Sequence, residues 1–357
     1  MSIVKKIRTA LRQFDAKRRN HSIALEVGFL KLLVRGKGRQ PELLEPKQVK
    51  RVLIVRNNKR IGNMFFLLPF VNYSKELYPN AEFDLLLSEP WQGTIFDNLG
   101  LKNVYYSQFG VKSIFDFFRT ISSVKKQQYD LILLPYGGSS DRIVTAMLNG
   151  KNVVAFYGAA DAAVCSHTFK YQAKYKHFAL SCIELLEQLG LPAPAQASAR
   201  LVLSDSEKQC AADELKLLLG EQNNKPCLAY FRGARGAKVI ADKDWQALLA
   251  KFKQHYAGDV NVIEILSPDV TRPLAEADFS YSNGDLRKLA AFLQQVPLFF
   301  CGDTGPLHLA SSAGAYCVGL FTVTNVAQYG CLGEHVVNVT DLDAIQAPAL
   351  LAELGLD

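Results

Sequence analysis

The chain has 357 residues, of which 49% are hydrophobic and 21% charged. This is typical of a globular protein long enough for two domains with separate cores. Its net charge of +7 is uneven, because residues 1–60 hold 17 Lys/Arg and 4 Asp/Glu while the other 297 residues hold 24 and 30. Charges interrupt every early apolar stretch and no window nears 18 uninterrupted apolar residues, so we expect neither a signal peptide nor a membrane span.

Residues 1–45 form a basic segment with two amphipathic patterns. Apolar residues recur at helical spacing, with Lys and Arg between them, at Ile3, Ile7, Leu11 and Phe14 and again at Ile23, Val27, Leu30 and Val34. Basic helices of this kind lie on anionic bilayer surfaces and gain about 1 kcal/mol per cation near the headgroups. The alternative is a pair of helices packed on the body. Sparse aromatic residues argue against nucleic acid.

Between residues 46 and 195, predicted strands alternate with predicted helices. The apolar runs predict strands at 49–55, 82–87, 129–135 and 153–157. The helical patterns cover 64–78, 111–126 and 175–189. The alternation predicts a doubly wound α/β domain.

A second alternation follows an uncharged, Pro- and Ala-rich linker that begins at Leu191. Strands are expected at 226–231, 260–266, 296–300 and 316–321, and helices at 205–219, 244–256, 286–295 and up to residue 313. We therefore expect a basic extension, 1–45, and two α/β domains, 46–195 and 196–357.

The most informative turn lies between the strand that ends at Phe300 and the helix that follows. Asp303 or Thr304 can cap that helix, and Gly305 lets the backbone approach a ligand. Pro306 fits the first helical turn. The N–H groups and the dipole of such a helix favour an anion, and phosphate is the natural guest. His308 lies one turn into the helix, near the same mouth.

This turn resembles the Asp-(Thr/Ser)-Gly-Pro-x-His-Leu-Ala signature of glycosyltransferase family 9, the bacterial heptosyltransferases. The resemblance spans about residues 50–335 and leaves the first 45 residues outside. It implies the GT-B architecture, in which two Rossmann-like domains face a cleft, with 46–195 as the acceptor-side domain and 196–357 as the nucleotide-sugar-binding domain. It also implies that Asp303, Thr304, Gly305, Pro306 and His308 bind the diphosphate of ADP-heptose.

A second glycine-containing loop, residues 232–238, follows the predicted strand 226–231. Two glycines and three cations at the carboxyl end of a strand suit a diphosphate. The loop resembles the family's loop that ends in a phosphate-binding lysine. By this resemblance Lys238 neutralises the leaving diphosphate and Arg235 assists. The alternative is a solvated basic loop.

Sugar transfer also requires that the acceptor hydroxyl lose a proton to a general base. Residues 52–63 resemble the family's opening strand and Gly-Asp loop, whose Asp is regarded as that base. In this sequence the position is Asn63, and an amide does not accept a proton at neutral pH. Three interpretations stay open: another carboxylate serves, Asn63 orients the acceptor, or the enzyme is weak or inactive.

Three further residues are candidates for the site. Asp141 follows a Gly-Gly-Ser-Ser loop and is either a base or a helix cap. Thr322 and Thr324, in a segment that resembles the family's Gly-Leu-Phe-Gly-x-Thr, are candidate phosphate or sugar contacts. Asp269, near a strand end, is a candidate partner for a ribose hydroxyl. The sequence has no Asp-x-Asp cluster and its histidine spacing suits no metal, so we expect neither metal nor cofactor.

The resemblance implies an inverting glycosyltransferase that moves heptose, or a related sugar, from an ADP-sugar to lipopolysaccharide core or another bacterial surface glycan. Seven cysteines without a Cys-x-x-Cys pair predict reduced thiols in the cytoplasm. The extension, 1–45, would bind the anionic inner membrane from that side.

Two other functions are weighed against this one. A catalytically impaired family member would keep the donor pocket and act as a sugar-nucleotide or glycan binding protein. A nicotinamide-dependent dehydrogenase is disfavoured, because neither domain's first turn carries Gly-x-Gly-x-x-Gly followed by an acidic residue.

Overall fold

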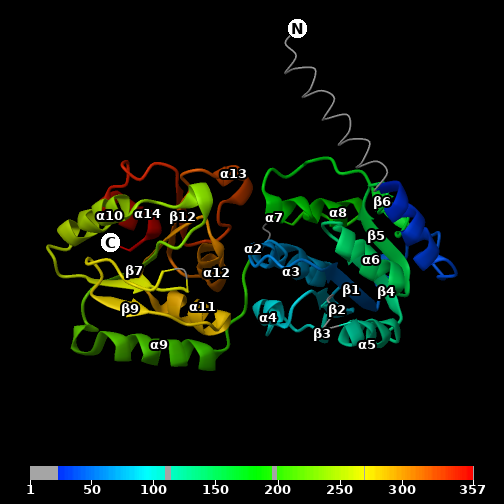
Figure 1. The fold of residues 1–357 in the computed structure, drawn as a ribbon, viewed down its shortest axis with the longest axis horizontal. Helices are drawn as coiled ribbons and strands as arrows, with labels where there is room; N and C mark the ends of the chain where they lie inside the picture. The colour runs from blue at the N-terminus through cyan, green and yellow to red at the C-terminus, as the bar shows by residue number, and fades with distance from the viewer. Residues whose placement is uncertain (1–22, 109–113, 195–198, 269, 357) are drawn as a thin grey trace, which may run out of the picture.

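The computed structural model describes residues 23–108, 114–194, 199–268 and 270–356. Within these ranges the chain forms two α/β domains, each built on a six-stranded parallel sheet, which lie side by side in Figure 1. The predicted doubly wound class and the GT-B architecture are confirmed. The predicted boundary at residues 195–196 lies outside the described residues.

The N-terminal sheet has the strand order β3-β2-β1-β4-β5-β6. Its strands are β1 (Arg51–Arg56), β2 (Glu82–Leu87), β3 (Asn103–Tyr106), β4 (Tyr129–Leu134), β5 (Gly150–Phe156) and β6 (His167–Phe169). One face packs on α5 (Ile114–Lys125) and α6 (Ser139–Met147), and the other on α3 (Leu68–Leu77) and α8 (Ile183–Gln188). The shorter elements are η1 (Pro46–Gln48), α2 (Gly62–Phe65), α4 (Pro90–Gly93), η2 (Thr94–Phe96) and α7 (Phe178–Ser181).

The C-terminal sheet repeats this topology in the order β12-β11-β10-β7-β8-β9. Its strands are β7 (Cys227–Phe231), β8 (Asn261–Ile265), β9 (Phe279–Tyr281), β10 (Phe299–Gly302), β11 (Cys317–Leu320) and β12 (Val336–Val339). One face packs on α10 (Asp242–His255) and α14 (Ala347–Leu354), and the other on α9 (Asp205–Leu219), α11 (Leu286–Gln295) and α12 (Gly305–Ala313). The shorter elements are η4 (Gly220–Gln222), η5 (Gly236–Lys238) and α13 (Val326–Tyr329).

The structure departs from the sequence-based elements in two ways. The strands β3, β6, β9 and β12 were not predicted, because each has three or four residues and lacks the run of fully buried side chains that marks a central strand. The single helix expected at 64–78 is two helices, α2 and α3, and the one expected at 175–189 is also two, α7 and α8. Pro69 explains the break between α2 and α3, since proline has no N–H for a helix interior and is tolerated in a first turn.

Residues 23–34 form a helix that packs on the N-terminal domain. Leu30 is fully buried against Ala146 and Val164, and Glu26 forms an ion pair with Arg142 at 3.0 Å. This part of the predicted extension is therefore packed on the body, whereas residues 1–22 lie outside the described residues. In the part of the chain that the structure describes, no helix has both the length and the apolar character to cross a bilayer.

One apolar core continues from the first domain into the second, so the two domains share a packed interface. At its centre α2 packs on α12, and these helices face each other in Figure 1. A Cβ atom on Gly305 would lie 3.2 Å from Cγ2 of Ile61, so the close approach of the helices favours glycine. The ring of Phe66 meets that of His308 edge-on, with centroids 5.0 Å apart.

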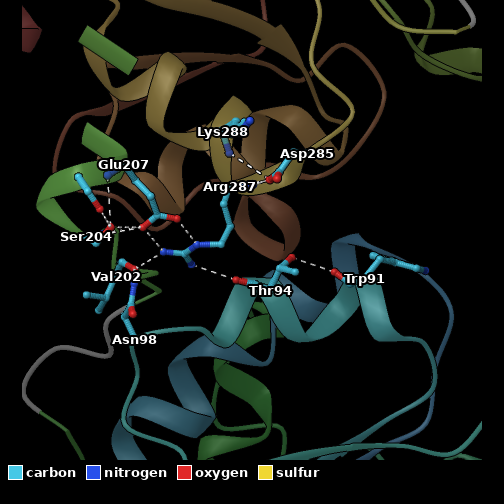
Figure 2. A network of polar contacts seen from close by, with 10 residues as sticks. Trp91, Thr94, Asn98, Val202, Ser204, Glu207, Asp285, Arg287 and Lys288 are labelled. Atoms are coloured by element: carbon cyan, nitrogen blue, oxygen red, sulfur yellow. Dashed lines mark hydrogen bonds and ion pairs between the residues drawn. The ribbon is translucent and has the colours of Figure 1, made fainter. Parts of the chain in front are cut away.

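A buried arginine joins the domains at another point of the interface (Figure 2). Arg287 of α11 is 9% exposed and donates to both carboxylate oxygens of Glu207. It also donates to the carbonyl oxygens of Val202, at 2.7 Å, and of Thr94 in the N-terminal domain, at 2.9 Å. The hydrogen bonds from Arg287 are the main cause that lowers the pKa of Glu207 to about 2, although burial opposes the shift.

We expect Arg287→Leu to lower the free energy of unfolding by about 3 kcal/mol, because it leaves the Glu207 carboxylate and two carbonyl groups without their donor. Urea unfolding at pH 7, followed by circular dichroism, measures the change. Lys102→Met is the matched control, since it removes an ion pair with Glu82 whose two side chains are about half exposed. Lys102→Met should lower the free energy of unfolding by less than about 1 kcal/mol.

The same pair predicts how this difference depends on pH. The pKa of Glu207 is lower in the folded than in the unfolded chain, so the pair stabilises fully above the unfolded value and is lost as pH falls through about 2. The gap in stability between wild type and Arg287→Leu should therefore shrink from pH 5 downwards. A gap that stays constant over this range would show that the ion pair is not its source.

Candidate active site

The candidate site lies where the strand order of the C-terminal sheet reverses. Because β7 and β10 are neighbours at this point, the loops that follow them meet at the carboxyl edge. They line a cavity of about 500 Å³. Its lining is Phe231, Gly233, Ala234, Arg235, Lys238, Ser267, Leu286, Leu289, Asp303, Thr304, Gly305, Pro306 and Leu309, with Ile61 from the N-terminal domain. The cavity therefore lies in the cleft between the domains.

The carboxylate of Asp303 joins these loops. Lys238 Nζ lies 2.6 Å from Asp303 Oδ2 and 3.1 Å from the Asp303 carbonyl oxygen. Thr324 Oγ1 donates to Oδ2 at 2.6 Å, and His308 Nε2 lies 3.2 Å from Oδ1. Burial alone would raise the pKa of Asp303, but the bonds from His308, Lys238 and Thr324 outweigh burial and hold that pKa well below its usual range.

His308 lies one turn into α12. Its side chain is almost fully buried, and Nδ1 is 3.7 Å from Cys331 Sγ. Burial alone would lower the pKa of His308, but Cys331 and the Asp303 carboxylate outweigh burial and raise that pKa to about 9. Lys238 and Arg235 bring two cationic side chains to the lining of the cavity, whereas His308 is not among its lining residues.

The amino end of α12 opens toward the same cavity. Thr304 is its N-cap residue, but the Thr304 side chain makes no capping hydrogen bond and lies 3.3 Å from Cys301 Sγ instead. Pro306 occupies the first turn and has no N–H of its own. The amino-terminal dipole of α12 and the cations beside it suit an anionic ligand.

Asn63 lies on α2, which packs against α12, but it is not among the residues that line the cavity. Its side chain is partly exposed, and Nδ2 donates to Asn58 Oδ1 at 2.9 Å. The same oxygen accepts from the backbone N–H of Arg60 at 2.8 Å. The loop after β1 thus presents hydrogen-bonding amides from this position.

Asp141 has the contacts of a helix cap. It is 1% exposed and accepts from the backbone N–H groups of Asn57 and of Gly138, the latter at 2.9 Å. Arg56 Nη1 lies 3.4 Å from its carboxylate. Burial is the main cause that raises the pKa of Asp141, against the effect of Arg56. These contacts fix the start of α6 and the loop after β1.

The remaining candidates lie elsewhere. Thr322 is exposed and lines a separate cavity of about 450 Å³ beside α10, whereas Thr324 reaches Asp303. Asp269 lies outside the described residues. Among the described residues, no three His, Cys, Asp or Glu side chains form a group that could hold a metal ion.

Sequence analysis missed the apolar wall of the cavity. Leu286 and Leu289 of α11 line it, together with Ile61 from the other domain. The turn of α11 that carries the two leucines also carries Arg287, whose contacts hold the helix against the N-terminal domain. An amphipathic helix just before the signature turn was the available signal, but its pattern does not distinguish a core face from a cavity wall.

The lining therefore combines basic side chains and a helix amino terminus with apolar side chains. The first suits a diphosphate, and fixed positive groups there stabilise the charge of a leaving phosphate group. The second suits a nucleoside, since ligand cavities bury flat apolar groups against such walls.

Comparisons with known proteins agree with this arrangement. Residues 282–350 match the family model of glycosyltransferase family 9 (heptosyltransferase). No curated protein matches the chain in sequence.

Solved structures match over most of the chain. A glycosyltransferase family 9 protein from Veillonella parvula has a TM-score of 0.72 at 14% identity, with 88% of this chain and 91% of that chain covered. Heptosyltransferase WaaC of E. coli, solved with ADP, has a TM-score of 0.66 at 16% identity, with 85% and 99% covered. The E. coli ADP-heptose lps heptosyltransferase II has a TM-score of 0.64 at 14% identity, with 85% and 97% covered. At these identities the likeness shows the fold.

The family match falls on the segment that contains the Asp303–His308 turn, and the fold of both domains is that of solved family members. Residues 282–350 therefore resemble glycosyltransferase family 9 (heptosyltransferase), and the two-domain fold is that of the solved heptosyltransferases.

Proposed function

We propose that the protein transfers heptose, or a related sugar, from an ADP-sugar to lipopolysaccharide core or another bacterial surface glycan, with inversion at the transferred carbon. The observation that carries the proposal is the meeting of Lys238, Arg235 and the amino end of α12 at one cavity that faces the other domain. The apolar wall of Leu286 and Leu289 would hold the adenosine. Solved relatives with ADP and with an ADP-heptose analogue support this choice of donor.

Incubation with ADP-heptose and lipopolysaccharide from a heptose-deficient strain should release ADP. Absence of turnover with this donor, and with GDP- and UDP-sugars, would contradict the proposal.

We expect Lys238→Met to weaken ADP binding about tenfold, because it removes an ammonium from the phosphate end of the cavity. Isothermal titration calorimetry at low and high salt measures the effect, which should shrink as salt screens the charge. Lys216→Met is the matched control, since Lys216 is an exposed lysine on α9 outside the cavity. Equal affinities of wild type and Lys238→Met for ADP would show that Lys238 does not contribute to ADP binding.

We also propose that the protein binds the cytoplasmic face of the inner membrane through residues 1–45. Helix 23–34 supports this proposal, because its outer face exposes Leu25, Phe29 and Leu32 by 75%, 51% and 67%. Lys31 and Arg35 are exposed beside these side chains. Apolar side chains flanked by cations are the features of a helix that lies in the interface of an anionic bilayer.

Replacement of Leu25, Phe29 and Leu32 by serine should reduce binding to phosphatidylglycerol-containing vesicles at least tenfold, because each side chain loses favourable burial. Vesicle sedimentation measures the bound fraction, and vesicles of neutral lipid should bind wild type weakly. Leu217→Ser is the control, as this side chain is 84% exposed on α9 of the other domain. Unchanged sedimentation of the triple variant would exclude this helix as the contact.

The alternative function is that of a catalytically impaired family member that binds sugar nucleotide or glycan. Two observations favour it: Asn63 occupies the position of the family's base, and Asp141 is buried with its carboxylate engaged by three donors. An amide does not take the proton of the acceptor hydroxyl, and a buried capping carboxylate is not accessible to it.

We expect Asn63→Asp to raise turnover while the affinity for ADP stays unchanged, because it places a carboxylate across the cleft from α12. The pH–rate profile should gain an ascending limb near the usual carboxylate pKa. Asn63→Ala is the matched control. Activity that appears in the aspartate variant alone would establish the impaired family member, whereas an active wild type and a fully active Asn63→Ala would show that another residue is the base.

A further inference from the structure

A second cavity, of about 390 Å³, lies at the carboxyl ends of β4 and β5. Its far wall comes from α13 of the C-terminal domain, which contacts α7 across the cleft. Six aromatic rings line it: Tyr136, Phe156, Tyr157, Tyr171, Phe178 and Tyr329. None of these residues belongs to the donor cavity.

Two of the six rings stack on each other, and two others are largely exposed to solvent. Tyr136 stacks on Phe178 with centroids 5.2 Å apart and an interplanar angle of 19°. Tyr171 meets Phe156 edge-on at 5.2 Å, and Tyr171 and Tyr157 are 45% and 68% exposed. Exposed rings gathered at one cavity are unusual on a soluble surface and mark an interaction site.

A carboxylate lies among these rings. Asp161 lines the cavity and is 8% exposed, with Arg142 Nη1 3.4 Å from its Oδ1. Two glycines leave space for the Asp161 carboxylate. A Cβ atom would lie 2.9 Å from Oδ1 if it were added to Gly137, and 2.5 Å from Oδ2 if it were added to Gly158. Gly137 also has a φ of +55°, which favours glycine. At the rim, Lys176 adds an exposed cation.

The second cavity adjoins the helix that carries Asn63. Tyr136 donates its hydroxyl to the carbonyl oxygen of Phe66 at 2.9 Å. Phe66 follows Asn63 by one helical turn and packs on His308 of the donor side. Phe66 also contacts Phe178 and Tyr329, with centroids 5.6 Å and 6.3 Å away. The short segment 61–66 therefore connects the two cavities, since Ile61 lines the first and Phe66 contacts rings of the second.

We propose that this second cavity binds the sugar ring of the acceptor glycan that receives the transferred residue. The inference rests on the proposed function and names the subsite of its acceptor. A pyranose presents a face of C–H bonds to the negative face of an aromatic ring, as Tyr157 and Tyr171 offer. Its hydroxyl groups donate to a carboxylate such as Asp161, and Lys176 receives an acidic substituent.

The test uses the full-length protein saturated with ADP and a deacylated core oligosaccharide from heptose-deficient lipopolysaccharide. Calorimetry and saturation-transfer NMR measure its binding. We expect the double variant Tyr157→Ala/Tyr171→Ala to bind the oligosaccharide at least tenfold more weakly, with unchanged affinity for ADP. Tyr171→Phe should keep its affinity, since it retains the ring. Phe115→Ala is the control, because Phe115 is 86% exposed on α5 and outside the cavity.

Equal oligosaccharide affinity in wild type and double variant would overturn the inference. So would a wild type that binds ADP but not the oligosaccharide. If wild type fails to bind ADP, the proposed function is overturned instead, and tyrosine-dependent oligosaccharide binding measured without ADP would still support the cavity. The two failures are therefore distinguishable.

Discussion

The Asp303 carboxylate is the contact on which the candidate active site depends. The reversal of strand order brings the loops after β7 and β10 together, but proximity alone does not fix their side chains. Asp303 does so by accepting from Lys238, His308 and Thr324, three residues that are far apart in sequence. Burial lowers the pKa of His308, but Cys331 and this carboxylate outweigh burial and raise it to about 9. One carboxylate thereby fixes the positions of the Lys238 and His308 side chains at the end of β10.

This arrangement also explains how a basic site stays folded without its ligand. Lys238 is 40% exposed, so its ammonium can leave Asp303 for an incoming phosphate at little cost in packing. Asp303 would then still be held by His308 and Thr324. Across the cleft, the close contact between Ile61 and Gly305 and the bonds of Arg287 hold the second domain against this loop. The charged side chains are therefore available to an anion, while the packing contacts and the Arg287 bonds hold the N-terminal domain in place beside them.

The sequence predicted those parts of the fold and site that depend on local pattern. Apolar periodicity predicted the helix 286–295, and glycine and proline predicted the turn at Asp303. Both lie where expected. Short edge strands such as β6 were missed because a strand that is half buried leaves no apolar run. The contacts of Arg287 were missed for another reason. Its partners Thr94 and Glu207 meet it only through the packing of two domains, which no local spacing records.

The two sheets have the same topology but different chemistry at the point where their order reverses. In the C-terminal domain, the carboxylate after the fourth strand, Asp303, organises cations at the cleft. In the N-terminal domain the corresponding loop carries Asp141, which is turned inward and satisfied by Arg56 and backbone N–H groups. The loop after β1 carries Asn58 and Asn63, whose side-chain amides are hydrogen-bonded to each other. The cations and the helix terminus in the lining of the C-terminal cavity suit an anionic leaving group, and in the proposed transfer the acceptor proton goes to a group other than these two amides.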